Sequence, residues 1–563
     1  MAAGAVPRAR RRRWVRALVL VAVGFAGGAL VFDRATRIVP PDVPAPRAER
    51  LRFADGVTWV GASSLERRGA LWVTHVRGEP VQLGYRYGRL VAPLMVAGDL
   101  RMLDLFATFV PSAALRTVLT AVVRARYHDV DRGFPPARRA EIYGEAVAYG
   151  DRGPAFLSPY HRLVYLHALY DIALAFERSP LLGCTAFVAS GEATRAGATP
   201  GHTIVGRNFD LDVDPWFDVE KTVQIVEPEG RLAFASIAWP GMTGVVTGMN
   251  AAGIWVSVNG ARAGTPDNAG VPVVFTTRAI LEEAHNLDEA IAIATRDAPM
   301  ASHMLLLADG ASGESAVIER APGRAPAVRR APAVTIVANH YATPTFAADP
   351  KDVFVRQHTS TLAREARMRE LVARNDGHID PATAIAMLRD RSAAGDTPLP
   401  LGNRNAIDAL IATHSVVADL TAGVLWVSEG PHTLGAYRRI DLRARLAHGG
   451  APTDEARSDV AADALLTDGG FERQLRGVEL RRTAERERAA GHATAAAEEY
   501  ERAVTLRTDD HLAWRGLAET RADTGDVEGA RAAWQHVVTL APESPDADAQ
   551  ARRAAATPET PAR

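Results

Sequence analysis

Cysteine is almost absent from this chain, since Cys184 is the only one among 563 residues. A single cysteine excludes any disulfide within the chain and leaves two interpretations, an inert buried side chain or a reactive thiol. The lack of paired cysteines does not exclude export, because a domain of this size can bury enough core without disulfides.

The chain also has few lysines and almost no net charge. Lys221 and Lys351 are the only lysines, the other basic residues are arginine, and the formal net charge is −1. Because basic and acidic residues are nearly equal in number, the chain has no excess positive charge, and we expect no nucleic-acid partner. The histidines are scattered and no spacing matches a zinc site, so we expect no metal and no cofactor.

One uncharged apolar run, from Ala17 to Phe32, follows a cluster of arginines near the N-terminus. At about 1.5 Å per residue it is slightly short for a hydrocarbon core of about 30 Å. The arginines predict a cytoplasmic N-terminus, a membrane anchor within residues 1–36 and an exported (periplasmic or extracellular) remainder. A cleaved signal peptide and a secreted protein are the alternative. Residues 37–50 are rich in proline and predict an extended linker.

Between the linker and residue 446 the chain changes from helical to strand-like patterns. Residues 51–183 are mixed, with long helical stretches. After Cys184 come paired apolar runs with turn residues between them, at 223–226 and 232–237, 244–247 and 253–258, and 303–308 and 315–319. Helical patterns lie between the second and third pairs, at 276–285 and 287–295, and after the third pair, at 362–373 and 381–389. Hairpins in two sets with helices between them predict a layered α+β domain over residues 184–446.

The C-terminal region repeats with a period of 34 residues (534 − 500), which separates Tyr500 from Trp534. This is the tetratricopeptide period, and it predicts two helical repeats over residues 477–542 after a linker over 447–476. An unrelated pair of helical hairpins is the alternative. Two repeats are few for independent stability, so we expect them to dock on the main domain or on a protein partner. Residues 543–563 are predicted to be disordered.

The residues around Cys184 favour a reactive thiol. Gly183 gives the preceding backbone the freedom that a self-cleaving peptide bond would need. A strand is predicted to start at the cysteine, and a second apolar strand leads into Gly206-Arg207-Asn208-Phe209-Asp210. In an antiparallel hairpin Arg207 and Asp210 would return beside Cys184, where an arginine favours the thiolate and an aspartate can orient an amine.

A papain-like arrangement is the alternative for a catalytic cysteine and needs a histidine from far downstream. His303, His340 and His414 are available. However, Cys184 is predicted on a strand and not on a helix, and the motif Cys-Gly-Ser-Cys-Trp is absent. The local context is therefore against this alternative.

Gly183-Cys184-Thr185-Ala186-Phe187, together with the motif at 206–210, resembles the N-terminal-nucleophile cysteine hydrolases. That group includes choloylglycine hydrolases, penicillin V acylases and the acyl-coenzyme A:6-aminopenicillanate acyltransferases, and the long segment before Gly-Cys is most similar to the acyltransferase branch, the C45 peptidase-like proteins. The resemblance extends from about residue 51 to residue 446. It implies a four-layer αββα sandwich and autocatalytic cleavage between Gly183 and Cys184, whose new α-amino group then serves as the base for its own thiol.

The resemblance also implies roles for four later residues. Arg207 would lie beside the nucleophile and Asp210 would contact it. Asn259 would donate its amide N–H to the oxyanion, and Asn339 would lie near the amino group. Each has a structural alternative, because Arg207 and Asp210 can form a simple ion pair and asparagines after strands are common turn residues.

Arg364 matches the late arginine of the family, with Arg367 as a competing assignment, and a solvated helix face is the structural alternative for Arg364. Three aromatic residues, Trp216, Phe217 and Trp239, either line an acyl pocket or belong to the core. The N-terminal anchor and the C-terminal repeats are not parts of the family pattern.

The sequence thus predicts a self-processing cysteine amidohydrolase or acyltransferase, in which Cys184 attacks a linear amide and forms an acyl-thioester. Its substrate would be a small acyl-amide or lipid-like molecule, and the repeats could bind a protein partner. Two alternatives stay open. One is a phospholipase B-like hydrolase of lipid esters or amides on the same fold. The other is a membrane-anchored tetratricopeptide scaffold with a degenerate enzyme domain.

Overall fold

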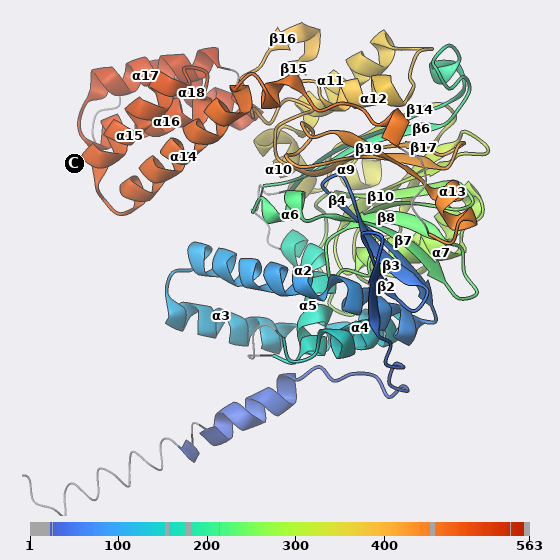
Figure 1. The fold of residues 1–563 in the computed structure, drawn as a ribbon. Helices are drawn as coiled ribbons and strands as arrows, with labels where there is room; N and C mark the ends of the chain where they lie inside the picture. Colours follow the sequence, from blue (N-terminus) through green and yellow to red (C-terminus); the bar gives the residue numbers. More distant parts are fainter. Residues whose placement is uncertain are drawn as a thin grey trace, which may run out of the picture.

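The computed structural model describes residues 23–24, 26–152, 157–175, 182–212, 214–450, 456–540 and 542–556. Two large sheets form the centre of the molecule, and helices cover their outer faces (Figure 1). A separate group of helices at the C-terminus lies beside the sheets. The α+β class predicted from the sequence is confirmed.

The larger sheet has eleven strands, and its order along the sheet follows the chain except where β4 meets β7. All neighbouring strands are antiparallel apart from the parallel pair β4 and β7. The strands are β1 (Leu51–Ala54), β2 (Val57–Val60), β3 (Ser63–Arg68), β4 (Leu71–Gly78), β7 (Thr222–Pro228), β8 (Phe234–Ala238), β9 (Thr247–Asn250), β10 (Ile254–Gly260), β11 (His303–Asp309), β12 (Ser315–Arg320) and β13 (Ala327–Ala331). Hairpins form at the three predicted places as β7–β8, β9–β10 and β11–β12, but β9 overlaps its predicted strand, 244–247, only at Thr247.

The smaller sheet has six strands in the order β14-β5-β6-β17-β18-β19. They are β14 (Val334–Val337), β5 (Leu182–Ala189), β6 (Ile204–Leu211), β17 (Ala412–Asp419), β18 (Val424–Ser428) and β19 (Tyr437–Asp441). A short hairpin, β15 (Ser392–Ala393) and β16 (Thr397–Pro398), stands apart. Strand β5 begins at Leu182, two residues before the predicted start, so Cys184 lies inside the strand.

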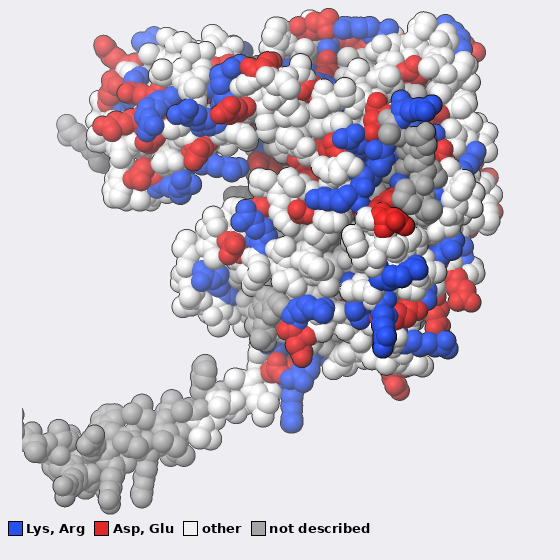
Figure 2. All heavy atoms as spheres, in the orientation of Figure 1, with Lys and Arg blue, Asp and Glu red and all other residues white. Residues whose placement is uncertain are grey.

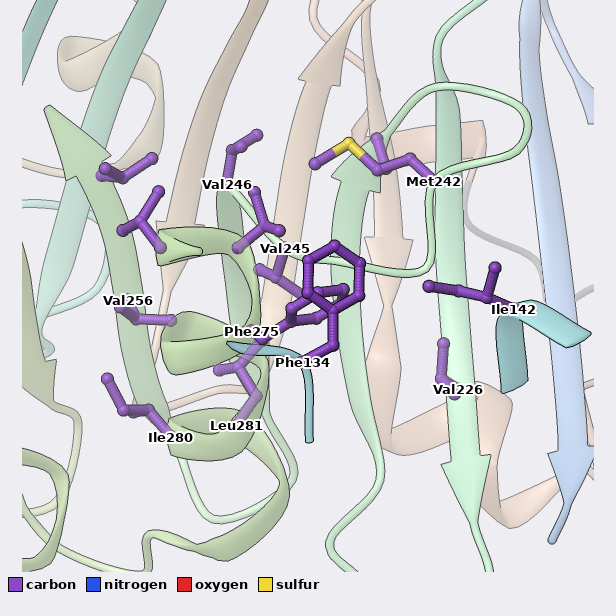
Figure 3. Packing of buried hydrophobic residues seen from close by; sticks show 14 of the residues in the cluster. Phe134, Ile142, Val226, Met242, Val245, Val246, Val256, Phe275, Ile280 and Leu281 are labelled. Atoms are coloured by element: carbon purple, nitrogen blue, oxygen red, sulfur yellow. The ribbon is translucent and has the colours of Figure 1, made fainter. Parts of the chain in front are cut away.

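Three buried apolar clusters define four layers. The first fills the space between the larger sheet and its helices, and Phe134 and Phe275 pack edge to face within it, with ring centroids 4.7 Å apart. Figure 3 shows both residues in this cluster. The second lies between the two sheets, and the third lies between the smaller sheet and its helices. Because successive side chains on a strand point to opposite faces, β5 contributes Ala186 and Val188 to the second cluster but Phe187 and Ala189 to the third.

The helices of the main domain occupy both outer layers. Those that contribute to the first cluster are α2 (Pro80–Phe109), α4 (Pro136–Tyr149), α5 (Pro159–Ala175), α7 (Val273–Glu283) and α8 (Leu287–Arg296), and those on the smaller sheet are α11 (Thr361–Arg374) and α12 (Pro381–Leu388). The others are α3 (Ala113–Arg126), α6 (Trp216–Val219), α9 (Pro344–Ala347), α10 (Pro350–His358) and α13 (Leu442–Ala447). Helices α2 and α4 cross closely at Gly84, where a β-carbon would come within 1.9 Å of the Glu141 carbonyl oxygen.

The C-terminal helices are α14 (Gly470–Ala489), α15 (Ala493–Leu506), α16 (His511–Asp523), α17 (Val527–Thr539) and α18 (Pro545–Ala556). They have their own core, which includes Ala484, Tyr500 and Leu517. Positive and negative side chains are interspersed over their surface (Figure 2). The helical prediction is therefore confirmed, while the assignment to tetratricopeptide repeats stays a prediction.

Two boundaries in this region differ from the prediction. Helix α14 begins at Gly470, inside the predicted linker. The segment expected to be disordered contains α18, because the Ser544 hydroxyl accepts from the Ala547 N–H, Pro545 stands in the first turn and the helix packs on α17. The last residues of that segment, 557–563, lie outside the described residues.

The predicted N-terminal span, residues 17–32, lies partly outside the described residues and stays a prediction. In the described part of the chain no single helix is both long and apolar enough to cross a membrane. Helices α2 and α3 meet that test only when taken together, and they are bent by 116° relative to each other.

Candidate active site

The hairpin of β5 and β6 in the smaller sheet places Cys184 opposite Phe209 and Gly183 opposite Asp210. Directly paired residues share a face of a sheet, and neighbours along a strand face opposite ways. Cys184 therefore projects into the layer between the two sheets. Gly183 and Asp210 lie on the other face, toward the outer helices.

The thiol of Cys184 is fully buried beside Arg207, whose Nη2 lies 3.7 Å from Sγ. Arg207 is itself held by two backbone carbonyls, donating to Val246 at 2.9 Å and to Val258. Burial raises the pKa of the Cys184 thiol, and Arg207 opposes that shift only in part. The sequence predicted that the arginine would favour the thiolate. In this arrangement the cost of removing a thiolate from water is the larger effect.

The backbone of Cys184 is held by Asn339 and Arg364. Its N–H donates to Oδ1 of Asn339 at 2.8 Å, and its carbonyl accepts from Arg364. Arg364 also donates to the same Oδ1 at 2.7 Å, and the Asn339 amide nitrogen donates to the Gly260 carbonyl at 3.0 Å. This pattern fixes the orientation of the Asn339 amide, because its oxygen faces two donors and its nitrogen faces an acceptor.

Asp210 leaves little room for a side chain at position 183. A β-carbon at position 183 would come within 3.2 Å of the Asp210 Cβ and 3.3 Å of its Oδ2. The φ angle of Gly183 is not in the left-handed region, so the strand needs a glycine here for space and not for the backbone freedom that the sequence suggested. Burial raises the pKa of Asp210 to about 6, although Arg364 opposes the shift, and its Oδ1 has no hydrogen-bond partner among the described residues.

Asn259, near the end of β10, is buried across the layer between the sheets. Its amide nitrogen donates to the Ala338 carbonyl at 2.8 Å, and its Oδ1 has no partner among the described residues. The sequence predicted that this N–H would serve a substrate oxyanion. In this structure the donor is committed to a carbonyl, so that role needs the amide to turn.

The structure separates the two competing arginines. Arg364 lies beside Cys184, while Arg367, one turn later on α11, pairs with Asp390 at 2.7 Å. Arg207 and Asp210 lie on opposite faces of β6, and no ion pair joins them in the described part of the chain.

The histidines of the papain-like alternative are engaged elsewhere. His303 contacts the Ala301 carbonyl, His340 contacts Glu365, and His414 contacts the Thr247 hydroxyl. Within the described ranges none of them contacts Cys184. The cysteine also lies on a strand, as predicted, so the local geometry does not support that alternative.

An apolar pocket of about 380 Å³ lies next to Cys184. It is lined by Phe209, the direct partner of Cys184 in the sheet, and by Val246, whose carbonyl accepts from Arg207. Most of its remaining wall comes from α2, α5 and the segment after β8. The three aromatic residues left open by the sequence, Trp216, Phe217 and Trp239, all line it.

A second pocket, of about 430 Å³, lies on the other face of the hairpin. Gly183, Asp210, Asn339 and Arg364 line it on the side of the main domain. The scissile position predicted from the sequence is thus flanked by an apolar pocket on one side and a more polar pocket on the other.

Two residues near the site were missed by sequence reasoning. Tyr170 on α5 lines the apolar pocket and is half-buried by surface exposure. Burial is the main cause that raises its pKa, and a charge on Cys184 raises that pKa further. Thr185 accepts a hydrogen bond from Arg364 at 2.8 Å. Tyr170 stands in an ordinary helical pattern and carries no sequence signal, whereas Thr185 stands next to the nucleophile and could have been found.

A protein-family model matches the central part of the chain. Residues 198–407 match the family model described as acyl-coenzyme A:6-aminopenicillanic acid acyl-transferase. The match begins downstream of Cys184 and includes the positions of all five other candidate residues, Arg207, Asp210, Asn259, Asn339 and Arg364.

One curated relative, an uncharacterized protein of Archaeoglobus fulgidus, is 23% identical over 240 residues, which is 39% of this chain and 38% of the relative. The chain thus covers well under half of that protein.

Two solved structures are similar in part. A Caenorhabditis elegans ortholog of N-acylethanolamine-hydrolyzing acid amidase is 17% identical, with a TM-score of 0.32 over 42% of this chain and 93% of that one. A variant of conjugated bile acid hydrolase from Clostridium perfringens is 13% identical, with a TM-score of 0.33 over 46% of this chain and 93% of that one.

Proposed function

Because residues 198–407 match the family model of the acyl-coenzyme A:6-aminopenicillanic acid acyl-transferases, an N-terminal-nucleophile group, we propose that this protein is a self-processing cysteine amidohydrolase or acyltransferase. Cys184 is the nucleophile in both the processing and the catalytic reaction. The observation that carries the proposal is the convergence of Arg207, Asn339 and Arg364 on the thiol, the N–H and the carbonyl of this one residue.

Processing starts when Sγ of Cys184 attacks the carbonyl carbon of Gly183. The peptide C–N bond breaks as the C–S bond forms, which gives a thioester and a free amino group on Cys184. Water then hydrolyses the thioester and leaves a carboxylate on Gly183. The new amine stays beside the Asn339 amide oxygen, which already accepts the N–H at this position at 2.8 Å.

In catalysis the freed amino group takes the proton of its own thiol, because it is the base nearest to it. The thiolate attacks the amide carbonyl of the substrate, the C–N bond breaks, and the amine half leaves with a proton. Water, or a second amine, then takes the acyl group from sulfur. Arg207 offsets the charge on sulfur at 3.7 Å while the thiol is kept out of water.

The apolar pocket supports an acyl half with a long hydrocarbon part. Its volume of about 380 Å³ and its aromatic wall suit an alkyl or aryl-alkyl chain, with Phe209 between the chain and the sheet. We therefore propose a linear N-acyl amide as the substrate class.

The test is intact mass together with turnover. The purified protein should separate into two chains that divide between Gly183 and Cys184, and the Cys184→Ala variant should stay a single chain of about 60.3 kDa without activity. A single uncut chain with full amidase activity would contradict the mechanism. Cleavage of the Cys184→Ala variant at the same bond would show that another protease makes the cut.

A lipid-ester hydrolase on the same fold is the second candidate, and the apolar pocket also favours it. The two candidates differ in the atom that leaves, nitrogen for an amide and oxygen for an ester. Paired substrates with the same acyl chain, one an ethanolamide and the other a glycerol ester, separate them. A preference of more than about tenfold in kcat/KM for the ester would favour the lipid-ester reaction.

A further inference from the structure

We infer that the C-terminal helices form one wall of the substrate site, and that Trp534 and Arg515 on this wall select the amine half of the substrate. This inference rests on the proposed amide reaction and adds to it the residues that decide which amines are accepted. It gives the C-terminal helices a role inside the enzyme itself.

The C-terminal helices are joined to the main domain by the segment between α17 and α18. The Glu543 carboxylate accepts from the backbone N–H of Arg404 at 2.9 Å, and the Pro542 carbonyl accepts from the Asn405 side chain at 3.1 Å. Both acceptors lie on the C-terminal side of the seam and both donors lie in the loop before β17. The seam therefore has complementary hydrogen-bonding groups on its two sides.

Further contacts stand on either side of this segment. Arg507, just before α16, is buried and donates to the Leu401 carbonyl at 2.9 Å. Helix α18 packs against α10, where His358 lies 3.8 Å from Asp546. The helical unit is thus held at three places along its length, which a freely moving adaptor would not need.

The polar pocket opens in this seam and takes a wall from each side. The main domain supplies Gly183, Asp210, Asn339 and Arg364, the residues of the scissile position. Helices α16, α17 and α18 supply the opposite wall, which includes His511, Arg515, Trp534, Val537 and Gln550. A pocket of about 430 Å³ is large enough for a small organic group, and it is incomplete without the C-terminal helices.

The placement of the two pockets assigns each half of the substrate. A carbonyl carbon at Sγ of Cys184 carries an acyl chain on one side and an amine on the other. Phe209 and Val246 put the apolar pocket on one side, and Gly183 and Asp210 put the polar pocket on the other. An apolar chain belongs in the first pocket, so the amine half extends toward the C-terminal wall.

Trp534 and Arg515 have the chemistry to discriminate among amines. The half-buried indole of Trp534 offers a flat apolar surface. The Arg515 side chain is 43% exposed and donates through Nε to Glu519 at 2.8 Å, so its guanidinium keeps one edge at the pocket. Together they favour an amine half that carries a hydrogen-bond acceptor beside an apolar part.

The experiment compares two substrate series. In the first, one dodecanoyl chain is joined to ethanolamine, glycine, aspartate or phenylalanine, and in the second one amine carries acyl chains of different length. Trp534→Ala and Arg515→Gln should change the ranking of kcat/KM in the amine series by tenfold or more, and the acyl ranking by less than threefold. Arg502→Gln, on the exposed surface of α15 away from the pocket, should change neither.

An unchanged amine ranking in both folded variants would overturn the inference. Circular dichroism checks folding. If Trp534→Ala proves unstable, Trp534→Phe is measured instead, and it should keep most of the amine ranking of the unmodified protein because it keeps an aromatic ring. Effects on the acyl series alone would also contradict it, because they would place the C-terminal wall on the other half of the substrate.

A second measurement separates this inference from the amide reaction. If the unmodified protein cleaves no amide in either series, the proposed function fails, and the alkylation rate of Cys184 still tests the wall. Because Cys184 is the only cysteine, iodoacetamide and a bulky maleimide report on it alone. Trp534→Ala should raise the ratio of the bulky to the small rate by about fivefold, and an unchanged ratio would overturn the inference.

Discussion

The amide nitrogen of Cys184 donates to the side-chain oxygen of Asn339, 155 positions later in the chain, at 2.8 Å. The same oxygen accepts from Arg364. One buried acceptor therefore serves both the N–H of Cys184 and the arginine that holds the Cys184 carbonyl. This shared acceptor links the stability of the site to its proposed chemistry.

Replacing Asn339 by leucine should destabilise the protein and block processing. The change leaves two buried donors without an acceptor, at a cost of about 2–4 kcal/mol in the free energy of unfolding. Urea unfolding of the Cys184→Ala form with and without the change measures it. Asn375→Ala, which removes a half-buried bond to the Leu371 carbonyl, should cost less than about 1 kcal/mol. Equal losses of unfolding free energy in the two variants would show that the two donors at Asn339 do not depend on its side-chain oxygen.

Arg364→Lys and Arg367→Lys should have different effects on the rate of processing. Arg364 contacts the Cys184 carbonyl and Asn339, so lysine there should slow processing by about a hundredfold, since it cannot keep several directed hydrogen bonds. Arg367 pairs with Asp390 away from the site, and lysine there should leave the processing rate within about threefold. The rate of chain cleavage after purification of the precursor provides the measurement. The reverse order would support Arg367 as the late arginine.

Asp210 should make stability depend on pH. Burial raises its pKa to about 6 from the ordinary value of 3.8, so the folded protein keeps a proton that the unfolded chain has lost. The stability that this proton gives is present below pH 4 and is lost as the pH rises to 6. Relative to Asp210→Asn in the Cys184→Ala form, stability should fall by about 3 kcal/mol between pH 4 and pH 7. Parallel pH profiles for the two forms would contradict this expectation.

Trp239→Ala should change the preference for acyl-chain length. Trp239 lines the apolar pocket 5.9 Å from the Phe209 ring centroid, so its removal lengthens the space for the chain. The optimum in kcat/KM should move to longer chains by several carbons, with a change of about tenfold for the longest substrates. Trp255→Phe, in the core between the sheets, is a control that should lower stability without moving the optimum. No shift in the optimum would place the acyl chain elsewhere.

Asn259→Ala tests whether an amide that now donates to a backbone carbonyl also serves the transition state. If the Asn259 amide turns toward the substrate oxygen, its loss should lower kcat by about a hundredfold or more with little change in KM. A fall in thermal stability with unchanged kcat would assign it only the bond to Ala338.

The hairpin predictions succeeded because their signals are local. Turn residues between short apolar runs indicated the hairpins β7–β8, β9–β10 and β11–β12, although β9 begins three residues later than predicted, and the run after Cys184 indicated β5. The prediction of a disordered tail was wrong for the residues of α18, because packing on α17 and α10 stabilises this alanine-rich helix of low hydropathy. The composition of a segment indicates how much conformational entropy its ordering costs, but it does not show which neighbouring surface the segment can pack on to offset that cost.

The sequence by itself determined the proposed nucleophile, because a single cysteine with a glycine before it and Arg207 and Asp210 in the next strand restricts the proposed chemistry to one position. It could not decide between Arg364 and Arg367, which differ by one helical turn in sequence and by their partners in space. Only the tertiary structure showed that Tyr170 lies near Cys184 and that the C-terminal helices share a pocket with Gly183, because contacts between distant segments depend on how whole layers pack. The same packing reversed the expectation for the thiol, since burial of Cys184 outweighs the charge of Arg207.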